Sequence, residues 1–577
     1  MTVLVMTFVS CEDFLNREPS EYSTVGFYKS AEAIREGAAG VYNHLYFDGI
    51  SYAITFTTWS DHCTPLAVTR DENTTISAGI LNPDLREVEY YWNNLYILLS
   101  RANSVIDGSK DFIDDLSALA KQYRSEVRVL RAYALYQLIA TYGDIPFFTS
   151  PVTVEQYTTT RTDRTEVLDF ILRDLESAAA DLQWIASERG RVDKAVALGL
   201  RARAALLGGS LNYGGKGADY FRIAAEAANT VIGERSLAKN FDDLFNITGQ
   251  EKADVRNEML FELMFSNVGG SRISHVTAFG QVSRNTGQTG RFPSMRLADT
   301  FECIDGLRID ESPLYDPKKP QKNRDPRFRS TIWMHGDSVT VNNGGVVTHI
   351  LEAYEENTPF YNYNTEKWEM KQNEDVVGGT SWASFSNSGV GYIWAKYCNE
   401  IAENISSQTC NIPVMRYSEI LLTYAEAKIE LNELDKSVYD AIDAVRIRAG
   451  MPGVSEGRKG DQWKMRQLVR RERKVEFLLE GLFFVDMRRW KIGDLLGEPS
   501  YGLPLKEIRY EGLSATDIPN FKKTDRHDLN DLASYDAYKE KLKVRDLNRQ
   551  WKDAHYLWPI PQIERLRNPN LGQNDGY

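Results

Sequence analysis

The stretch that most constrains the fold runs from Leu468 to Trp490, where apolar and charged residues alternate at helical spacing. Four apolar residues recur at intervals of seven, four and three, and so share one helical face: Leu468, Val475, Leu479 and Leu482. Glu472 falls on that face beside four cations: Arg470, Arg471, Arg473 and Lys474. Because an isolated buried charge is costly, Glu472 must be paired. The stretch predicts a core helix with an internal Arg–Glu network.

Gly481 interrupts this pattern. A glycine inside a helix costs about 1 kcal/mol relative to alanine. We therefore expect either that another backbone passes close to Gly481 or that the helix ends before Phe483. A solvated surface helix with i,i+4 ion pairs would explain the charges, but not the apolar run Leu482–Val485 beside them.

The composition of the 577 residues is that of a globular protein, with 42% hydrophobic and 26% charged residues. A net charge of −13 argues against nucleic acid or an anionic membrane as a partner, because both attract basic surfaces. The chain is rich in aromatic residues, with 30 Tyr, 24 Phe and 11 Trp. We expect some of these to remain outside the core and serve a binding surface.

The N-terminus resembles the end of a bacterial lipoprotein signal. Residues 1–10 are mostly apolar and lead to Ser10-Cys11, so we expect residues 1–10 to be removed and Cys11 to be lipidated. The usual basic n-region is missing, which a start upstream of Met1 would explain. Residues 11–26 would then form a tether. The alternative is an apolar terminus with an incidental cysteine.

Cysteine pairing stays open at this point. Export permits disulfides, and the four cysteines besides Cys11 allow three pairings: Cys63, Cys303, Cys398 and Cys410. Cys398 and Cys410 are close enough in sequence to pair, and buried thiols are the alternative.

Helical periodicity dominates residues 27–240 and 412–498 and predicts a mainly α fold of tetratricopeptide-like hairpins. The clearest helices are expected at 85–106, 116–142, 165–184, 194–207, 220–232, 417–431 and 438–449. Residues 49–84 lack this periodicity and predict a long loop. Residues 241–411 predict a loop-rich insertion with short strands at 259–265, 329–333, 338–341 and 391–397. Residues 499–577 are expected to be mostly irregular.

Several segments match one family in order along the chain. They comprise Cys11–Leu15, Arg131-Ala132, Gly143–Pro146, Phe301, Asp305-Gly306, Arg324–Phe328, Arg416–Leu422, Tyr424–Ala427, Arg446–Gly450, Arg470–Arg473, Glu480-Gly481, Asp486–Trp490, Pro559–Pro561 and Asn568–Asn570. On these motifs the chain resembles the SusD-like (SusD/RagB) family of surface lipoproteins of Bacteroidetes. Each motif is short, and together they extend over some 560 residues. They belong to the scaffold, so they leave the ligand open.

The resemblance implies one SusD-like domain over residues 27–577, with four tetratricopeptide-like hairpins and a loop-rich half that carries the ligand site. It also implies display on the outer face of the outer membrane through the lipid anchor. A SusC-like, TonB-dependent transporter would be the partner, with the lipoprotein as its lid. Family ligands are mainly oligosaccharides and sometimes peptides.

Signatures of catalysis are poor. The chain has no His-Glu-x-x-His, no Cys-x-x-Cys and no Gly-x-Ser-x-Gly motif, and its seven His are scattered. The glycine-rich run Gly208–Gly217 lacks the spacing and the Ser or Thr of a phosphate loop, so a turn explains it better. We therefore expect a protein that is not an enzyme and needs neither a metal nor a cofactor.

Sugar binding calls for exposed aromatic rings beside planar polar groups, because a sugar ring has an apolar C–H face and a rim of hydroxyls. Loops that combine the two supply eight candidate ligand-binding residues: Trp59, Asp61, Arg70, Phe279, Arg284, Tyr361, Trp368 and Trp382. Trp333 and Trp394 lie in strand-like runs and are expected in the core.

The sequence therefore predicts a surface lipoprotein that captures a glycan and delivers it to a TonB-dependent transporter. Three alternatives remain: a peptide-capturing lipoprotein of the same type, a helical-repeat adaptor that binds only protein, and a glycoside hydrolase or lyase. Incubation with a panel of glycans separates these hypotheses, because an enzyme would release products and an adaptor would not bind glycans.

Overall fold

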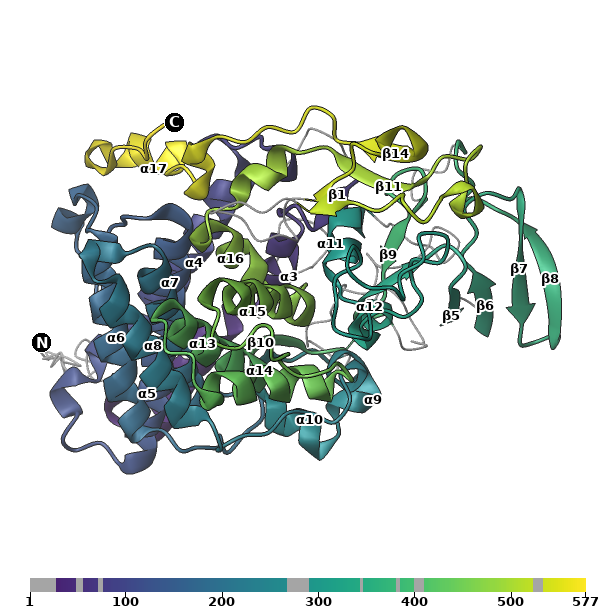
Figure 1. The fold of residues 1–577 in the computed structure, drawn as a ribbon. Coiled ribbons are helices and arrows are strands. Elements are labelled where there is room, and N and C mark those ends of the chain that lie inside the picture. The colour runs from purple at the N-terminus through teal and green to yellow at the C-terminus, as the bar shows by residue number, and fades with distance from the viewer. Residues whose placement is uncertain are drawn as a thin grey trace, which may run out of the picture.

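The computed structural model describes residues 27–47, 55–70, 76–266, 290–342, 346–379, 384–398, 409–521 and 533–577. The fold is mainly α, as the periodicity predicted. Figure 1 shows long helices packed side by side at one end of the molecule and the loop-rich part with its short strands at the other.

The long helices have these bounds: α2 Ala31–Asn43, α4 Arg86–Gly108, α5 Ala118–Tyr142, α6 Arg164–Asp181, α7 Lys194–Ser210, α8 Gly217–Val231, α13 Tyr417–Glu430 and α14 Lys436–Arg448. Each of α4 to α8 packs on the next, and α13 packs on α8 and α14, so the array continues across the intervening insertion. Asp163, Asp193 and Asp435 accept backbone N–H groups at the starts of α6, α7 and α14, which stabilises those ends.

The predicted core helix is two helices, α15 (Gln462–Phe477) and α16 (Leu482–Arg489). The chain turns between them, with left-handed backbone at Leu479 (φ 62°) and Gly481 (φ 77°). A Cβ on Gly481 would lie 2.7 Å from the carbonyl oxygen of Thr57. Both expectations for Gly481 are thus confirmed. The prediction of a single helix is wrong, because α15 ends before this turn.

Glu472 is fully buried, as predicted. Its partners are Arg327 at 2.9 Å, in α12 (Pro326–Thr331), and Arg446 in α14. The expected network within the helix is therefore wrong, because Glu472 is bound by arginines of other elements. Of the neighbouring cations, Arg471 pairs with Glu302 outside this stretch, whereas Arg473 pairs within it, with Asp486 of α16.

Short strands build small antiparallel sheets in the remainder. The pairs are β1 (Ala67–Thr69) with β3 (Arg291–Pro293), β2 (Met259–Leu263) with β10 (Ile412–Arg416), β4 (Ile332–Met334) with β9 (Tyr392–Trp394), β11 (Ser500–Pro504) with β14 (Leu542–Arg545), and β12 (Asn520–Phe521) with β13 (Ala533–Ser534). A four-stranded sheet follows the chain order of β5 (Ser338–Asn342), β6 (Val346–Ile350), β7 (Asn357–Asn362) and β8 (Lys367–Gln372). All four predicted strand regions contain strands.

Short helices complete the fold: α3 Phe56–Asp61, α9 Ile247–Gln250, α10 Ala253–Glu258, α11 Met295–Thr300 and α17 Gln562–Arg567. The segment after α16 passes over the top of the view in Figure 1, from the loop-rich part at β11 and β14 back to the helical end at α17. Cys63, Cys303, Cys398 and Cys410 are buried thiols. None of the helices in the described ranges is long and apolar enough to cross a membrane.

Candidate functional site

An aromatic cluster lies on one face of the four-stranded sheet, on strands that Figure 1 shows at the outer edge of the loop-rich part. Tyr361 on β7 faces Trp368 on β8, with ring centroids 5.5 Å apart. Tyr363 follows β7, and its ring lies 4.9 Å from that of Tyr361. Trp368 is 57% exposed and Tyr363 48% exposed. We call these three residues the aromatic platform.

Strand alternation explains why the platform is exposed. Successive side chains of a strand point to opposite faces, so Tyr361 and Phe360 lie on different sides of the sheet. Phe360 is directly opposite His349, which is 3% exposed, and His349 is opposite Val339, which is also buried. One face therefore packs toward the body of the protein, and the face of Tyr361 and Trp368 meets solvent.

Hydroxyl groups of β5 and β6 lie beside the platform. The hydroxyl of Tyr363 lies 3.2 Å from that of Thr348, which in turn lies 2.8 Å from that of Thr340. Glu369 of β8, which accepts a hydrogen bond from the Thr365 hydroxyl at 2.8 Å, is paired with Phe360 and so lies on the opposite face of the sheet. Aromatic rings bordered by hydroxyl groups suit a sugar ring, because its C–H face stacks while its hydroxyls form hydrogen bonds.

The structure brings two of the sequence-predicted residues together, Tyr361 and Trp368. The expectation that 350–390 consists of loops is wrong at these positions, because β7 and β8 form a hairpin there. Sequence analysis missed Tyr363 and the 65% exposed Met370 of β8. The alternation in Lys367–Gln372 was a signal that could have revealed the strand and its exposed face.

The sequence had suggested that Trp59 and Asp61 lie in an exposed loop, but the structure places them elsewhere. They belong to α3, and their exposed fractions are 6% and 1%. Trp59 packs on Phe56, with ring centroids 5.2 Å apart. Asp61 accepts hydrogen bonds from the backbone N–H groups of Gly481 and Phe484, at 2.9 and 3.1 Å. Both side chains hold α3 in the core, so neither is available on a surface.

Arg70 is half-buried at the end of β1, and its backbone N–H donates to Gly290 at 2.8 Å. The other predicted site residues lie outside the described residues: Phe279, Arg284, Trp382 and the lipidation site Cys11. Trp394 is buried, as expected. Trp333 is 9% exposed and borders a cavity of about 690 Å³ beside Phe241 and Asn246.

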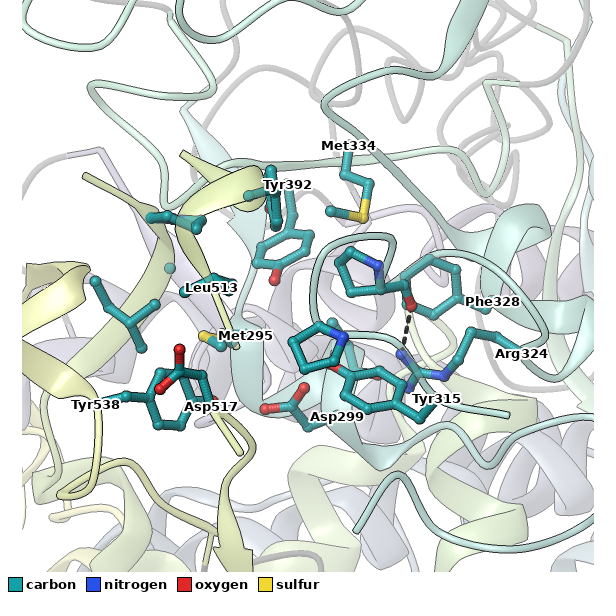
Figure 2. A pocket seen from close by; sticks show the side chains of 17 residues that line it. Met295, Asp299, Tyr315, Arg324, Phe328, Met334, Tyr392, Leu513, Asp517 and Tyr538 are labelled. Carbon is teal, nitrogen blue, oxygen red and sulfur yellow. Dashed lines mark hydrogen bonds between the residues drawn. The ribbon is translucent and has the colours of Figure 1, made fainter. Parts of the chain in front are cut away.

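Figure 2 shows a second concave feature, a cavity of about 20 Å³ between β11 and the 295–334 segment. Tyrosines dominate its wall (Tyr315, Tyr392, Tyr510 and Tyr538). Asp299 accepts a hydrogen bond from Tyr535 at 2.7 Å, and burial raises the pKa of its carboxyl to about 6. This volume holds about one water molecule, so the cavity is too small for a sugar.

Metal chemistry finds no support in the described ranges, which hold no group of three His, Cys, Asp or Glu side chains arranged for an ion.

Comparison with known proteins covers the whole chain. The sequence model of the SusD family matches residues 257–577, and a model described as "Starch-binding associating with outer membrane" matches residues 13–206. SusD-like protein P2 of Formosa agariphila is 22% identical over 604 residues, covering 100% of this chain and 98% of that protein. A SusD-like protein of Bacteroides ovatus is 25% identical over 42% of this chain and 45% of its own length.

Solved structures have the same fold. A SusD-like carbohydrate binding protein from Bacteroides fragilis superposes with a TM-score of 0.72 at 24% identity, covering 95% of this chain and 100% of that chain. Surface glycan-binding protein A from Bacteroides fluxus gives a TM-score of 0.61 at 19% identity, covering 95% and 99%. The motifs, the helical array and the match over more than half of the chain agree, and the chain belongs to the SusD family.

Proposed function

We propose that this protein captures oligosaccharides at the cell surface and passes them to a TonB-dependent outer-membrane transporter. The observation that carries the proposal is the aromatic platform, in which Tyr361, Tyr363 and Trp368 gather on one side of a sheet and Tyr363 and Trp368 are exposed. The rings pack edge-to-face on one another, yet about half of the surface of Trp368 and Tyr363 stays exposed. Their spacing of about 5 Å suits contact with one or two adjoining sugar rings.

The proposal includes binding without bond cleavage and needs no cofactor or metal. It also includes attachment to the outer membrane through a lipid on Cys11, with a SusC-like transporter as partner. Support for this location comes from the outer-membrane association in the description of the matching family model. Support for a glycan ligand comes from two structural neighbours described as carbohydrate- or glycan-binding proteins.

A glycan array probed with soluble protein lacking residues 1–26 tests the capture step. We expect saturable binding to at least one class of oligosaccharide and no shortened products after prolonged incubation. Release of products would show instead that the protein is an enzyme. Binding of peptides, with no glycan bound, would identify a peptide-capturing protein of the same type.

The lipid anchor and the transporter partner have to be tested in cells. Full-length protein should incorporate labelled fatty acid and be accessible to protease on intact cells, and Cys11→Ala should abolish both. An affinity tag on the wild-type protein should co-purify a TonB-dependent transporter from detergent-solubilised outer membranes. Unlabelled wild-type protein recovered from the cytoplasm would contradict the proposed location.

A further inference from the structure

A cavity of about 720 Å³ lies away from the aromatic platform, among the helical scaffold and the C-terminal segment. Its wall combines the end of α5, the start of α6 and the turn after α7 with residues 553–557 and 573–575. Two cations that follow one another closely in the sequence, Arg488 of α16 and Lys491, also border it. This volume is typical of a ligand site.

Arg488 is 4% exposed and has no carboxylate within ion-pair distance in the described parts of the chain. Its Nη1 donates to the carbonyl oxygen of Phe484 at 2.8 Å, and its guanidinium lies 3.6 Å from the centre of the Phe484 ring. Its Nε is buried and meets no hydrogen-bond acceptor. Burial lowers the pKa of Arg488 to about 10, whereas the pKa of Arg489 is raised, because Asp486 and Glu426 outweigh the effect of its burial.

The next residue, Arg489, is also a buried arginine, but it forms ion pairs. Arg489 binds both oxygens of Glu426 at 2.6 Å and contacts Asp486 at 2.8 Å. Uncompensated buried charge is costly, and a bound anion would remove that cost at Arg488. With Nη1 engaged by Phe484 and Nε closed off from solvent, Nη2 is the donor that remains, and it can form a charge-assisted hydrogen bond with a carboxylate.

The other charged side chains that line the cavity restrict the kind of anion that could bind there. Lys491 is exposed, and Arg161 donates to Asn574 Oδ1 at 2.6 Å without an ion pair in the described ranges. Asp144 is bound to Arg164 at 2.8 Å, and Asp163 accepts the N–H of Thr165 at 2.7 Å.

Asp553 and Asp575 also border the cavity and are exposed. No hydrogen bond joins either carboxylate to another described side chain. These two carboxylates would repel a multiply charged anion, but they are good acceptors for hydroxyl groups.

We infer that this cavity binds the carboxylate of a uronic-acid residue in an acidic oligosaccharide, with Arg488 as its main ligand. One carboxylate accepts a hydrogen bond from Nη2 of Arg488 and lies in the field of Lys491, while sugar hydroxyls donate to Asp553 and Asp575. The inference rests on the proposed capture of oligosaccharides and adds a substrate class and a second contact region. Inorganic sulfate and phosphate should not compete for it.

The test is calorimetric titration of the soluble protein with oligogalacturonate, oligoalginate and glucuronoxylan fragments, each beside a neutral oligosaccharide of matched length. At least one acidic fragment should bind more tightly than its neutral counterpart. Arg488→Gln should weaken that binding by about tenfold to a hundredfold, because a charge-assisted hydrogen bond is lost. Lys491→Gln should weaken it by about threefold, and Lys436→Gln, a highly exposed cation of α14, should leave it unchanged.

Arg488→Lys is the variant that controls for a loss of folding. It keeps the charge and loses the Nη2 donor, so it should retain the wild-type melting temperature more closely than Arg488→Gln and still bind weakly. Arg488 also borders a cavity of about 10 Å³, and a water molecule there could bind Nη2 in place of a ligand. In that case acidic binding would be the same in wild type and in both Arg488 variants, which would overturn the inference.

The remaining outcomes separate this inference from the proposed function. Binding of neutral glycans with no preference for acidic ones overturns the inference alone. Binding of no oligosaccharide overturns both. Titration with a triglutamate peptide forms the last arm, and peptide binding that depends on Arg488, without binding of any uronate, would replace the acidic sugar by a peptide carboxylate.

Discussion

The carboxylate of Asp61 accepts a hydrogen bond of 2.9 Å from the backbone N–H of Gly481, although the two residues are 420 positions apart in the sequence. Asp61 ends α3, and Gly481 immediately precedes α16. Asp61 also accepts the N–H of Phe484, so its side chain serves the first turn of α16 as a capping group would. This contact joins the N-terminal part of the chain to the central helix pair.

Asp61→Ala should lower the free energy of unfolding by about 2–4 kcal/mol, because two buried N–H groups lose their acceptor. Asp61→Asn should cost less, since the amide oxygen still accepts one of them. Chemical denaturation measures both values. If Asp61→Ala instead left stability unchanged and abolished glycan binding, Asp61 would be a ligand residue, as the sequence had suggested.

Gly481→Ala should destabilise the protein by about 3 kcal/mol, from the left-handed backbone and the close approach to Thr57. Gly460 offers a matched control, because its φ is +74° and a Cβ there would meet no atom within 4 Å. Gly460→Ala should therefore cost only about 1–2 kcal/mol. Equal losses of unfolding free energy in the two variants would show that Thr57 moves away without cost.

Glu472→Ala should destabilise by about 3–5 kcal/mol, because Arg327 and Arg446 would each lose a buried carboxylate. Glu456→Ala is the control, since that side chain is 88% exposed and pairs with Lys459 three residues away. It should change the free energy of unfolding by less than about 0.5 kcal/mol. A similarly small change for Glu472→Ala would be incompatible with a buried network.

Acid should weaken the same network through Glu302. Burial alone would raise the pKa of Glu302, but Arg471, Arg446 and Arg458 hold it at about 2, below its ordinary value of 4.5. A depressed folded-state pKa gives stability that is present above about pH 4.5 and is lost as the pH falls toward about 2.

The full contribution is about 3 kcal/mol. Glu302→Gln should therefore show a shallower loss of unfolding free energy than wild type between about pH 5 and pH 3. Asp440→Asn, at an exposed position of α14, should keep the wild-type slope. Parallel slopes for wild type and Glu302→Gln would remove Glu302 as a source of acid sensitivity.

Local patterns predicted the helices well, because apolar residues at helical spacing and Asp or Gly at the ends determine them residue by residue. They also predicted that Glu472 is buried, since its position among apolar residues is local information. They could not name Arg327 and Arg446, which come from elements 145 and 26 residues away.

The site was predicted only in part for the same reason. Tyr361 and Trp368 were selected for their residue type, and the structure pairs them because β7 and β8 form a hairpin. Trp59 and Asp61 were selected on the same criterion and proved buried, because α16 and Trp558 cover α3. Whether a polar, aperiodic segment lies on the surface depends on what packs over it, and a local pattern does not contain that information.

The aromatic platform is the central claim, and one measurement tests it most directly. The glycan that binds best on the array is titrated calorimetrically into wild type, Trp368→Ala and Tyr157→Ala, a control with a 61% exposed ring away from the sheet. Trp368→Ala should weaken binding about tenfold, equivalent to about 1–2 kcal/mol of stacking, with an unchanged melting temperature. Tyr157→Ala should bind as wild type does. Wild-type affinity in Trp368→Ala would contradict the claim that this platform binds the glycan.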